Sequence, residues 1–131
     1  MDATMTGNAA IVLSGYQAFV RGDVPALFAL FDEEIEWTLP GPRQLAGTYV
    51  GHEGVARFFE RLATAWEQEL RVDEAVELDR DRVLVLGTHV VEGADGAFEA
   101  RFAHLWRMRD GRALSFYEYT DTERFATAFR G

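Results

Sequence analysis

The chain has 131 residues, of which 48% are hydrophobic and 13% aromatic; this is enough for one compact domain with a core and too little for two. Its net charge is −9, every basic residue is an arginine, and no basic cluster stands out, which argues against nucleic acid as a partner. The absence of cysteine excludes disulfides, thiolate nucleophiles and thiolate metal sites.

Nothing in the sequence indicates a membrane or secretory protein. The longest apolar run, residues 26–31, is far too short to span a bilayer. The N-terminal stretch MDATMTGNAA lacks the basic region of a signal peptide. We therefore expect a cytoplasmic protein with no membrane partner.

The first half of the chain predicts three helices and a short strand. Helical spacing of apolar residues indicates a helix over 9–21, ended by Gly22, and Asp23 caps a second one, VPALFALF, which is apolar nearly all round and expected to be buried. A strand in EEIEWTLPGP stops at Pro40, and RQLAGTYVGHEG reads as loop or a short strand. EGVARFFERLATAWEQE then predicts an amphipathic helix, with Val55, Phe58, Phe59, Leu62 and Trp66 on one side.

In the second half the apolar period changes to two. Strands are predicted near 70–79, 82–92, 97–109 and 112–120, with hairpin turns in GADG and RDG. A capping box from Thr120 to Glu123 starts a final helix. This order predicts a single α+β domain over 1–131, with a core at about 9–129 and helices on one face of a bent sheet.

Two segments resemble a known family. The element order, the segment GTYVGHEGVARFF and the closing RMRDGRALSFYEYTDT resemble the nuclear transport factor 2-like (NTF2-like) superfamily, closest to its SnoaL-like and ketosteroid-isomerase-like branch. The resemblance covers roughly 9–129. It implies a cone-shaped fold, with three N-terminal helices packed on a curved, mostly antiparallel sheet and a short C-terminal helix. It also implies one deep apolar pocket, commonly in a dimer, but no particular chemistry.

The orientation of the polar strand residues follows from alternation and turn length. Across 97–109 the even positions face inward, His104 among them. A three-residue turn with Gly111 as a bulge would pair His104 with Phe116 and turn Glu118 inward, whereas a two-residue turn would turn Glu118 outward. We favour the bulge, because it joins Phe102, Trp106, Leu114 and Phe116 into one apolar face. A two-residue turn within GADG places His89 opposite Ala100, also inside.

His89, His104 and Glu118 are therefore the candidate catalytic residues. A buried carboxylate costs several kcal/mol unless it is paired or protonated, so Glu118 needs a partner such as histidine. A Glu–His pair in a dry pocket suits proton transfer near neutral pH, with Glu118 as acceptor and His104 donating to an oxyanion or moving the proton. The alternative is that both histidines are hydrogen-bonded core residues. Metal spacing is absent, so no metal or cofactor is expected.

The pocket is expected to be largely aromatic. Glu36 and Thr38 share one face of the first strand and Trp37 the other, and the sequence leaves open which face lines the cavity. His52, just before a helix, is expected to make a loop hydrogen bond near the pocket mouth. The candidate ligand contacts are Tyr16, Phe19, Trp37, Thr38, Tyr49, His52, Phe58, Phe59, Leu62, Phe102, Trp106 and Phe116.

The catalytic sets of the family carry over only in part. The ketosteroid-isomerase positions for a tyrosine and two aspartates align with Gly15, Thr38 and His104, so that mechanism is not expected, although Tyr16 is one residue away. In the limonene-epoxide-hydrolase-like members the last-strand aspartate matches Glu118, but their arginine and first aspartate fall near Gly87 and His89.

Three functions are compatible with these residues. The first is a cofactor-independent isomerase, cyclase or lyase acting on a small hydrophobic or aromatic molecule by acid–base chemistry. The second is a non-catalytic binding protein for such a ligand. The third is an accessory domain that dimerises through the outer sheet face, where Leu84, Leu86, Val90 and Leu105 lie; a homodimer through this face is expected in any case.

Overall fold

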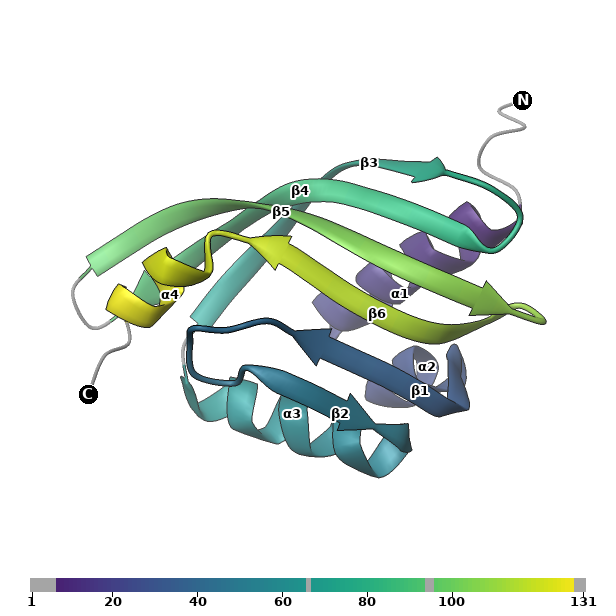
Figure 1. The fold of residues 1–131 in the computed structure, drawn as a ribbon, viewed down its shortest axis with the longest axis horizontal. Coiled ribbons are helices and arrows are strands. Elements are labelled where there is room, and N and C mark those ends of the chain that lie inside the picture. Colours follow the sequence, from purple (N-terminus) through teal and green to yellow (C-terminus); the bar gives the residue numbers. More distant parts are fainter. Residues whose placement is uncertain (1–6, 66, 94–95, 129–131) are drawn as a thin grey trace.

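The structure is a computed structural model that describes residues 7–65, 67–93 and 96–128 (Figure 1). The helices are α1 (Asn8–Arg21), α2 (Val24–Ala29), α3 (Gly51–Ala65) and α4 (Thr122–Ala128). The strands are β1 (Phe31–Leu39), β2 (Gly47–Val50), β3 (Glu67–Glu77), β4 (Arg82–Gly93), β5 (Gly96–Arg109) and β6 (Arg112–Thr120). Among these residues no helix is both long and apolar enough to cross a bilayer.

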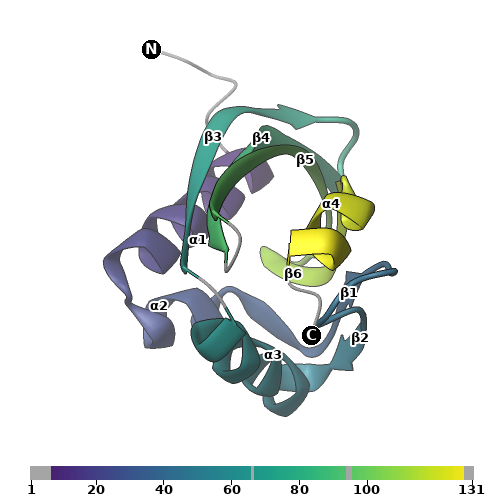
Figure 2. The ribbon, with the colours of Figure 1, turned by 90° about the vertical axis from the view of Figure 1, so that its left-hand side faces the viewer.

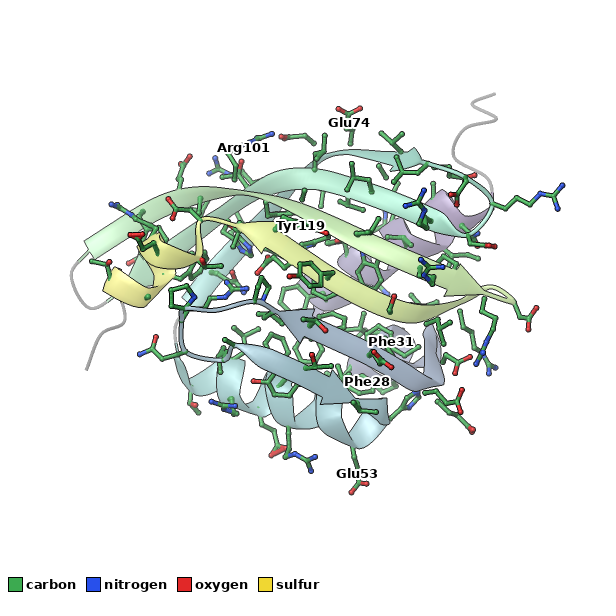
Figure 3. The ribbon with its side chains drawn as sticks, in the orientation of Figure 1. Phe28, Phe31, Glu53, Glu74, Arg101 and Tyr119 are labelled. Carbon is green, nitrogen blue, oxygen red and sulfur yellow. The ribbon has the colours of Figure 1, made fainter. Side chains whose placement is uncertain are left out.

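One curved sheet organises the molecule. Its strand order is β2-β1-β6-β5-β4-β3, and within the described ranges every pairing is antiparallel except β1 with β6. Seen end-on, the sheet curls from β3 round to β1, helices α1, α2 and α3 lie against its concave side, and α4 lies beside the end of β6 (Figure 2). Glu74 and Arg101 point away from the body of the molecule, on the convex side (Figure 3).

The helix ends follow the sequence signals, with two corrections. Gly22 ends α1 in the left-handed conformation (φ 72°), and the Asp23 carboxylate accepts a hydrogen bond from the Ala26 amide at 3.2 Å. The expectation of a fully buried second helix is wrong: of α2 only Leu27 is buried, because the opposite side of this helix faces away from the sheet. The cap of α4 is Asp121, which accepts from the Arg124 amide at 3.0 Å, and not the predicted Thr120. The predicted core position Trp66 lies outside the described residues.

The β5–β6 hairpin orients Glu118 inward, by a different route from the one predicted. Arg109 pairs with Arg112 across a two-residue turn, Asp110 and Gly111, with φ of 53° and 77°. Alone, this turn would point Glu118 outward. However, the register shifts between Arg107 and Met108, and Leu114 is the extra residue on β6. The bulge therefore lies inside β6 and not at the turn.

The bulge has two consequences for side-chain direction. Ala113 takes the inward place predicted for Leu114, which is only half-buried. Beyond the bulge the alternation resumes, Trp106 pairs with Phe116, and His104 pairs directly with Glu118. The β4–β5 register is as predicted, with His89 opposite Ala100.

Gly87 provides the space for the aromatic ring behind His104. A Cβ at position 87 would lie 2.1 Å from the Arg71 carbonyl oxygen and 2.5 Å from Cζ of Phe102, which is its partner on β5. The Phe102 ring in turn stacks on the His104 imidazole, with centroids 4.0 Å apart. Glycine at this position thus allows β3, β4 and Phe102 to pack closely beneath the imidazole.

We expect Gly87→Ala to lower the free energy of unfolding by about 2 kcal/mol or more, because backbone and ring atoms must move to admit one methyl group. Urea unfolding followed by circular dichroism measures this. Thr88→Ala, on the outer face of the same strand, is the control and should cost less than about 1 kcal/mol. A Gly87→Ala protein as stable as wild type would refute the packing argument.

Candidate active site

A largely aromatic cavity lies between the concave face of the sheet and the helices. It has a volume of about 620 Å³, its open mouth included. Of the predicted contacts it is lined by Tyr16, Phe19, Trp37, Phe58, Phe59, Leu62, Trp106 and Phe116. It is also lined by His89, His104 and Glu118, and Trp37 stacks on Phe116 with ring centroids 3.9 Å apart. Strand β1 therefore presents Trp37, and not Glu36, to the interior.

Four predicted contacts do not line this cavity. Thr38 lies on the other face of β1, bonded to the Thr48 hydroxyl at 3.0 Å. The Tyr49 hydroxyl donates to the Leu45 carbonyl and so turns away from the cavity. His52 lies within α3, where its Nε2 is 3.0 Å from the Phe31 carbonyl oxygen. Phe102 is buried behind the two histidines, with its ring centroid 4.9 Å from that of His89.

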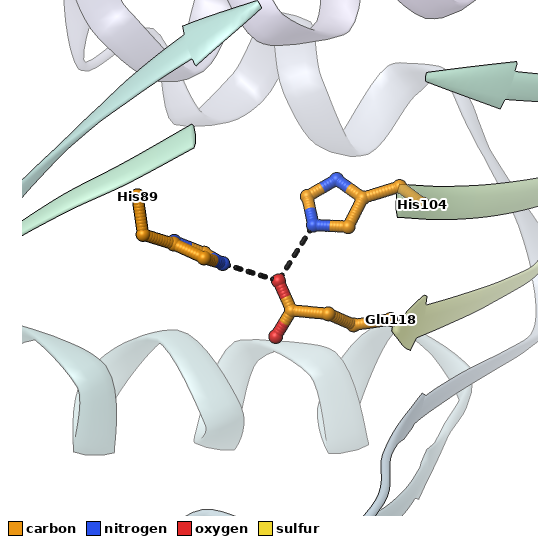
Figure 4. A group of neighbouring side chains, drawn as sticks. All are labelled: His89, His104 and Glu118. Atoms are coloured by element: carbon orange, nitrogen blue, oxygen red, sulfur yellow. Dashed lines mark hydrogen bonds and ion pairs between the residues drawn. The ribbon is translucent and has the colours of Figure 1, made fainter. Parts of the chain in front are cut away.

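His89, His104 and Glu118 meet at one carboxylate oxygen, as Figure 4 shows. Oε2 of Glu118 lies 2.5 Å from Nε2 of His89 and 2.7 Å from Nε2 of His104. The three residues are 3–5% exposed and come from the adjacent strands β4, β5 and β6. The sequence prediction that they converge is correct.

The second oxygen of the Glu118 carboxylate binds a residue that was not predicted from the sequence. Arg43, in the loop between β1 and β2, places Nη2 2.5 Å from Oε1 of Glu118, and its side chain is 2% exposed. Its guanidinium carbon lies 5.0 Å from the centroid of the Phe125 ring, on α4. No spacing rule marks one loop arginine among many. The available signal was indirect: a buried carboxylate in an arginine-only chain favours a guanidinium partner.

The outer ring nitrogens of the histidines are also bonded. Nδ1 of His104 lies 2.6 Å from the Tyr16 hydroxyl, which in turn accepts a hydrogen bond from the Trp106 indole at 3.0 Å. Nδ1 of His89 lies 2.8 Å from Oε1 of Gln68, a second residue that the sequence did not reveal. Tyr16, which was one residue out of register with the family tyrosine, does reach the cavity.

The hydrogen bonds and the burial of His104 together define its protonation. The pKa of Glu118 is lowered, so its carboxylate only accepts and Nε2 of His104 carries the proton between them. Because burial lowers the pKa of His104, its Nδ1 carries no proton and accepts from the Tyr16 hydroxyl. The imidazole is then neutral and donates from Nε2 to Glu118. We call Tyr16–His104–Glu118 the hydroxyl–imidazole–carboxylate chain.

Burial and hydrogen bonds shift the pKa of each of these three residues. Burial lowers the pKa of His104 from its ordinary value of 6.5, although the hydrogen bond to Glu118 opposes this. Burial alone would raise the pKa of Glu118, but hydrogen bonds from His104 and His89 outweigh it, and the pKa lies well below 4.5. Burial also raises the pKa of Tyr16 well above 10, so the phenol stays protonated at neutral pH.

The same three residues have the donor set of a metal site. One ligand atom each from His89, His104 and Glu118 lie within 4.8 Å of one another. Two imidazoles and a carboxylate suit zinc or iron. However, Arg43 already neutralises this carboxylate, and a divalent cation would have to be held beside the guanidinium. This electrostatic cost favours protons over a metal between these atoms.

The comparisons with known proteins identify the family. The model of the SnoaL-like domain matches residues 12–116. An NTF2-like protein of unknown function from Burkholderia pseudomallei is 33% identical, with 97% of this chain and 100% of that chain covered and a TM-score of 0.89. TerC, co-crystallised with polyporic acid, is 30% identical over 95% of this chain and 98% of its own, with a TM-score of 0.85. A search of curated proteins finds no match.

A more distant structure shares the fold alone. It is a candidate polyketide cyclase from Xanthomonas campestris, 20% identical over 93% of this chain and 96% of that one, with a TM-score of 0.77. In the described part of the chain, four helices on a mixed, open six-stranded sheet match the architecture that the sequence predicted. The chain therefore belongs to the SnoaL-like domain family, on an NTF2-like fold.

Proposed function

We propose that this protein is a cofactor-independent enzyme of the isomerase, cyclase or lyase kind, which moves a proton on a small aromatic or polyketide-like molecule. The observation that carries the proposal is the hydroxyl–imidazole–carboxylate chain at the wall of an apolar cavity. The family and the TerC–polyporic acid complex support a conjugated small molecule as the ligand.

Within this proposal Glu118 is not the proton acceptor. Three donors, from Arg43, His89 and His104, already share its two oxygens, and its pKa lies well below 4.5 because those hydrogen bonds outweigh burial. A general base works best with a pKa near the operating pH. Glu118 instead fixes the tautomer of His104 and stabilises the imidazolium that forms when His104 takes up a proton.

The proton path then runs through Tyr16. The substrate C–H or O–H bond breaks and its proton passes to the Tyr16 oxygen, while the Tyr16 proton passes to Nδ1 of His104. The products of this step are a substrate enolate and an imidazolium beside Glu118. Reversal of both transfers onto a different substrate atom returns the enzyme to its starting state. The neutral Tyr16 hydroxyl, whose pKa burial keeps high, also donates to the enolate oxygen.

A binding function is the second candidate, and one observation favours it. Every ring nitrogen of His89 and His104 and both oxygens of Glu118 have a hydrogen-bond partner. A fully bonded network is rigid, which suits a site that only orients a ligand. In that case the ligand is recovered unchanged.

We also propose that two copies associate through the convex face of the sheet. Leu84, Leu86, Val90 and Leu105 lie half-exposed on this face, and Tyr119 is 52% exposed. Apolar side chains gathered on the outer face of a sheet support an interface between copies.

The proton-transfer role is tested by hydrogen–deuterium exchange of 2-tetralone, an enolisable bicyclic ketone, followed by NMR in D₂O. Wild-type protein should accelerate exchange over buffer, and His104→Gln, Glu118→Gln and Tyr16→Phe should each lose about 100-fold or more of that acceleration. His52→Gln, which removes a histidine outside the cavity, is the matched control and should keep wild-type exchange. Exchange that is no faster than in buffer would favour the binding function. Accelerated exchange that survives His104→Gln would refute the proposed role of His104.

The stability of the folded state should fall on acidification in two ranges. The pKa of His104 is lowered by burial, so the unfolded chain binds a proton there first and stability declines as pH falls below about 6.5. The lowered pKa of Glu118, where its hydrogen bonds to His104 and His89 outweigh burial, adds a decline below about 4.5. Each group contributes up to about 1.4 kcal/mol per pH unit.

Urea unfolding at a series of pH values from 3.5 to 7.5 measures both ranges. Glu118→Gln should flatten the lower one, and His104→Gln the upper one. A wild-type protein whose unfolding free energy is constant from pH 7.5 to 4 would contradict the protonation states assigned here.

Leu105→Glu should convert the proposed dimer to a monomer, because it places a charge at the centre of the convex face. Light scattering after size-exclusion chromatography measures the mass. Arg57→Glu, on the exposed side of α3, is the control and should leave the mass unchanged. A wild-type protein that is monomeric at 100 µM would exclude the dimer.

A further inference from the structure

The cavity wall contains two buried N–H groups that have no partner. They are Nε of Arg43 and Nε1 of Trp37; among the described residues these are the buried side-chain nitrogen and oxygen atoms that lack a hydrogen bond. Both residues line the cavity. Both groups are donors, and a buried donor without a partner costs about 1–3 kcal/mol. The ligand that completes this site must therefore supply acceptors.

Of the two unpaired N–H groups, Nε of Arg43 is the stronger evidence for an acceptor on the ligand. Its side chain is 2% exposed, and one nitrogen, Nη2, is committed to Glu118, which leaves Nε free. A guanidinium presents its N–H groups as a planar fork that suits carboxylate and similar oxyanions. The Phe125 ring, 5.0 Å from the guanidinium carbon, helps to hold this fork in place.

Glu118 is the carboxylate that pairs with this guanidinium, with Nη2 of Arg43 2.5 Å from Oε1. In the orientation that the structure shows, His89 lies between Oε1 of Gln68 and Oε2 of Glu118, so both of its ring nitrogens already have partners. The unpaired Nε of Arg43 is therefore the donor that remains for an acceptor oxygen of the ligand.

We propose that the ligand is a flat conjugated molecule with an acidic oxygen, a carboxylate, phenolate or enolate, which accepts a hydrogen bond from Nε of Arg43. The stacked rings of Trp37 and Phe116 provide a flat apolar wall for its conjugated part. This inference rests on the proposed function of the cavity as a small-molecule site and names the chemical class of its substrate.

The test compares two probes of the same shape, 2-naphthoate and the neutral ketone 2-acetonaphthone, by isothermal titration calorimetry. Wild-type protein should bind 2-naphthoate at least tenfold more tightly. Arg43→Gln should weaken 2-naphthoate at least tenfold and leave the ketone within threefold. Arg57→Gln, which removes an exposed arginine, should change neither affinity more than twofold.

Glu118→Gln should have the opposite effect on the affinity for 2-naphthoate. It frees the guanidinium from its carboxylate partner, so 2-naphthoate should bind at least threefold more tightly than to wild type, although the same change removes proton transfer. Equal affinity of wild type for both probes, or a preference for 2-naphthoate that survives Arg43→Gln, would overturn the proposal.

The proposal can be tested even if one of the variants does not fold. If Arg43→Gln does not fold because Glu118 loses its guanidinium partner, the double variant Arg43→Gln/Glu118→Gln removes both charges and should show no preference for the anion. The wild-type comparison needs no variant. Charge preference without 2-tetralone exchange would reject the enzyme function and keep the anion site. Exchange of 2-tetralone without a preference for 2-naphthoate would keep the enzyme function and reject the anion site.

Discussion

The carboxylate of Glu118 is the interaction on which the rest of the site depends. A charge that is 3% exposed is stable only because two imidazoles and a guanidinium surround it. Both imidazoles are held in turn by a second residue, His89 by Gln68 and His104 by Tyr16. The bonded network therefore extends from β3 across β4, β5 and β6 to α1, and it links the concave face of the sheet to the helix that covers it.

In the proposed function, the residues of this network have two different chemical roles. His104 and Tyr16 hold protons that can move, because the imidazole is neutral and the phenol is protonated. Arg43 is proposed to bind an acidic oxygen of the ligand through its guanidinium. Glu118 contacts both groups, which explains why it is anionic and yet a poor base.

The sequence alone was enough to predict the fold and to predict that His89, His104 and Glu118 converge. Alternation along β5 placed His104 inside without ambiguity, and the short turn in GADG placed His89. Glu118 was predicted inward for the wrong reason, because the extra residue is Leu114 within β6 and not Gly111 at the turn. A bulge inside a strand has no sequence signature such as a glycine, so its position depends on which side chains pack best.

Arg43 and Gln68 could not be predicted from the sequence, because their roles arise only from contacts between segments distant in sequence. Thr38, Tyr49 and His52 were misplaced because residue type alone does not say on which side of a strand or helix a polar group bonds.

The one parallel strand pairing among the described residues has a consequence for how such a site can diversify. Because β1 and β6 run the same way, the loop that leaves β1 begins beside the end of β6, where Glu118 lies. The guanidinium proposed to select an anion thus belongs to the loop 40–46, whereas the residues proposed to transfer the proton belong to β5, β6 and α1. Under this proposal, replacement of the loop 40–46 would redirect the protein towards neutral or cationic compounds and leave the proton-transfer residues unchanged. The choice of molecule and the proton transfer would then depend on different parts of the fold.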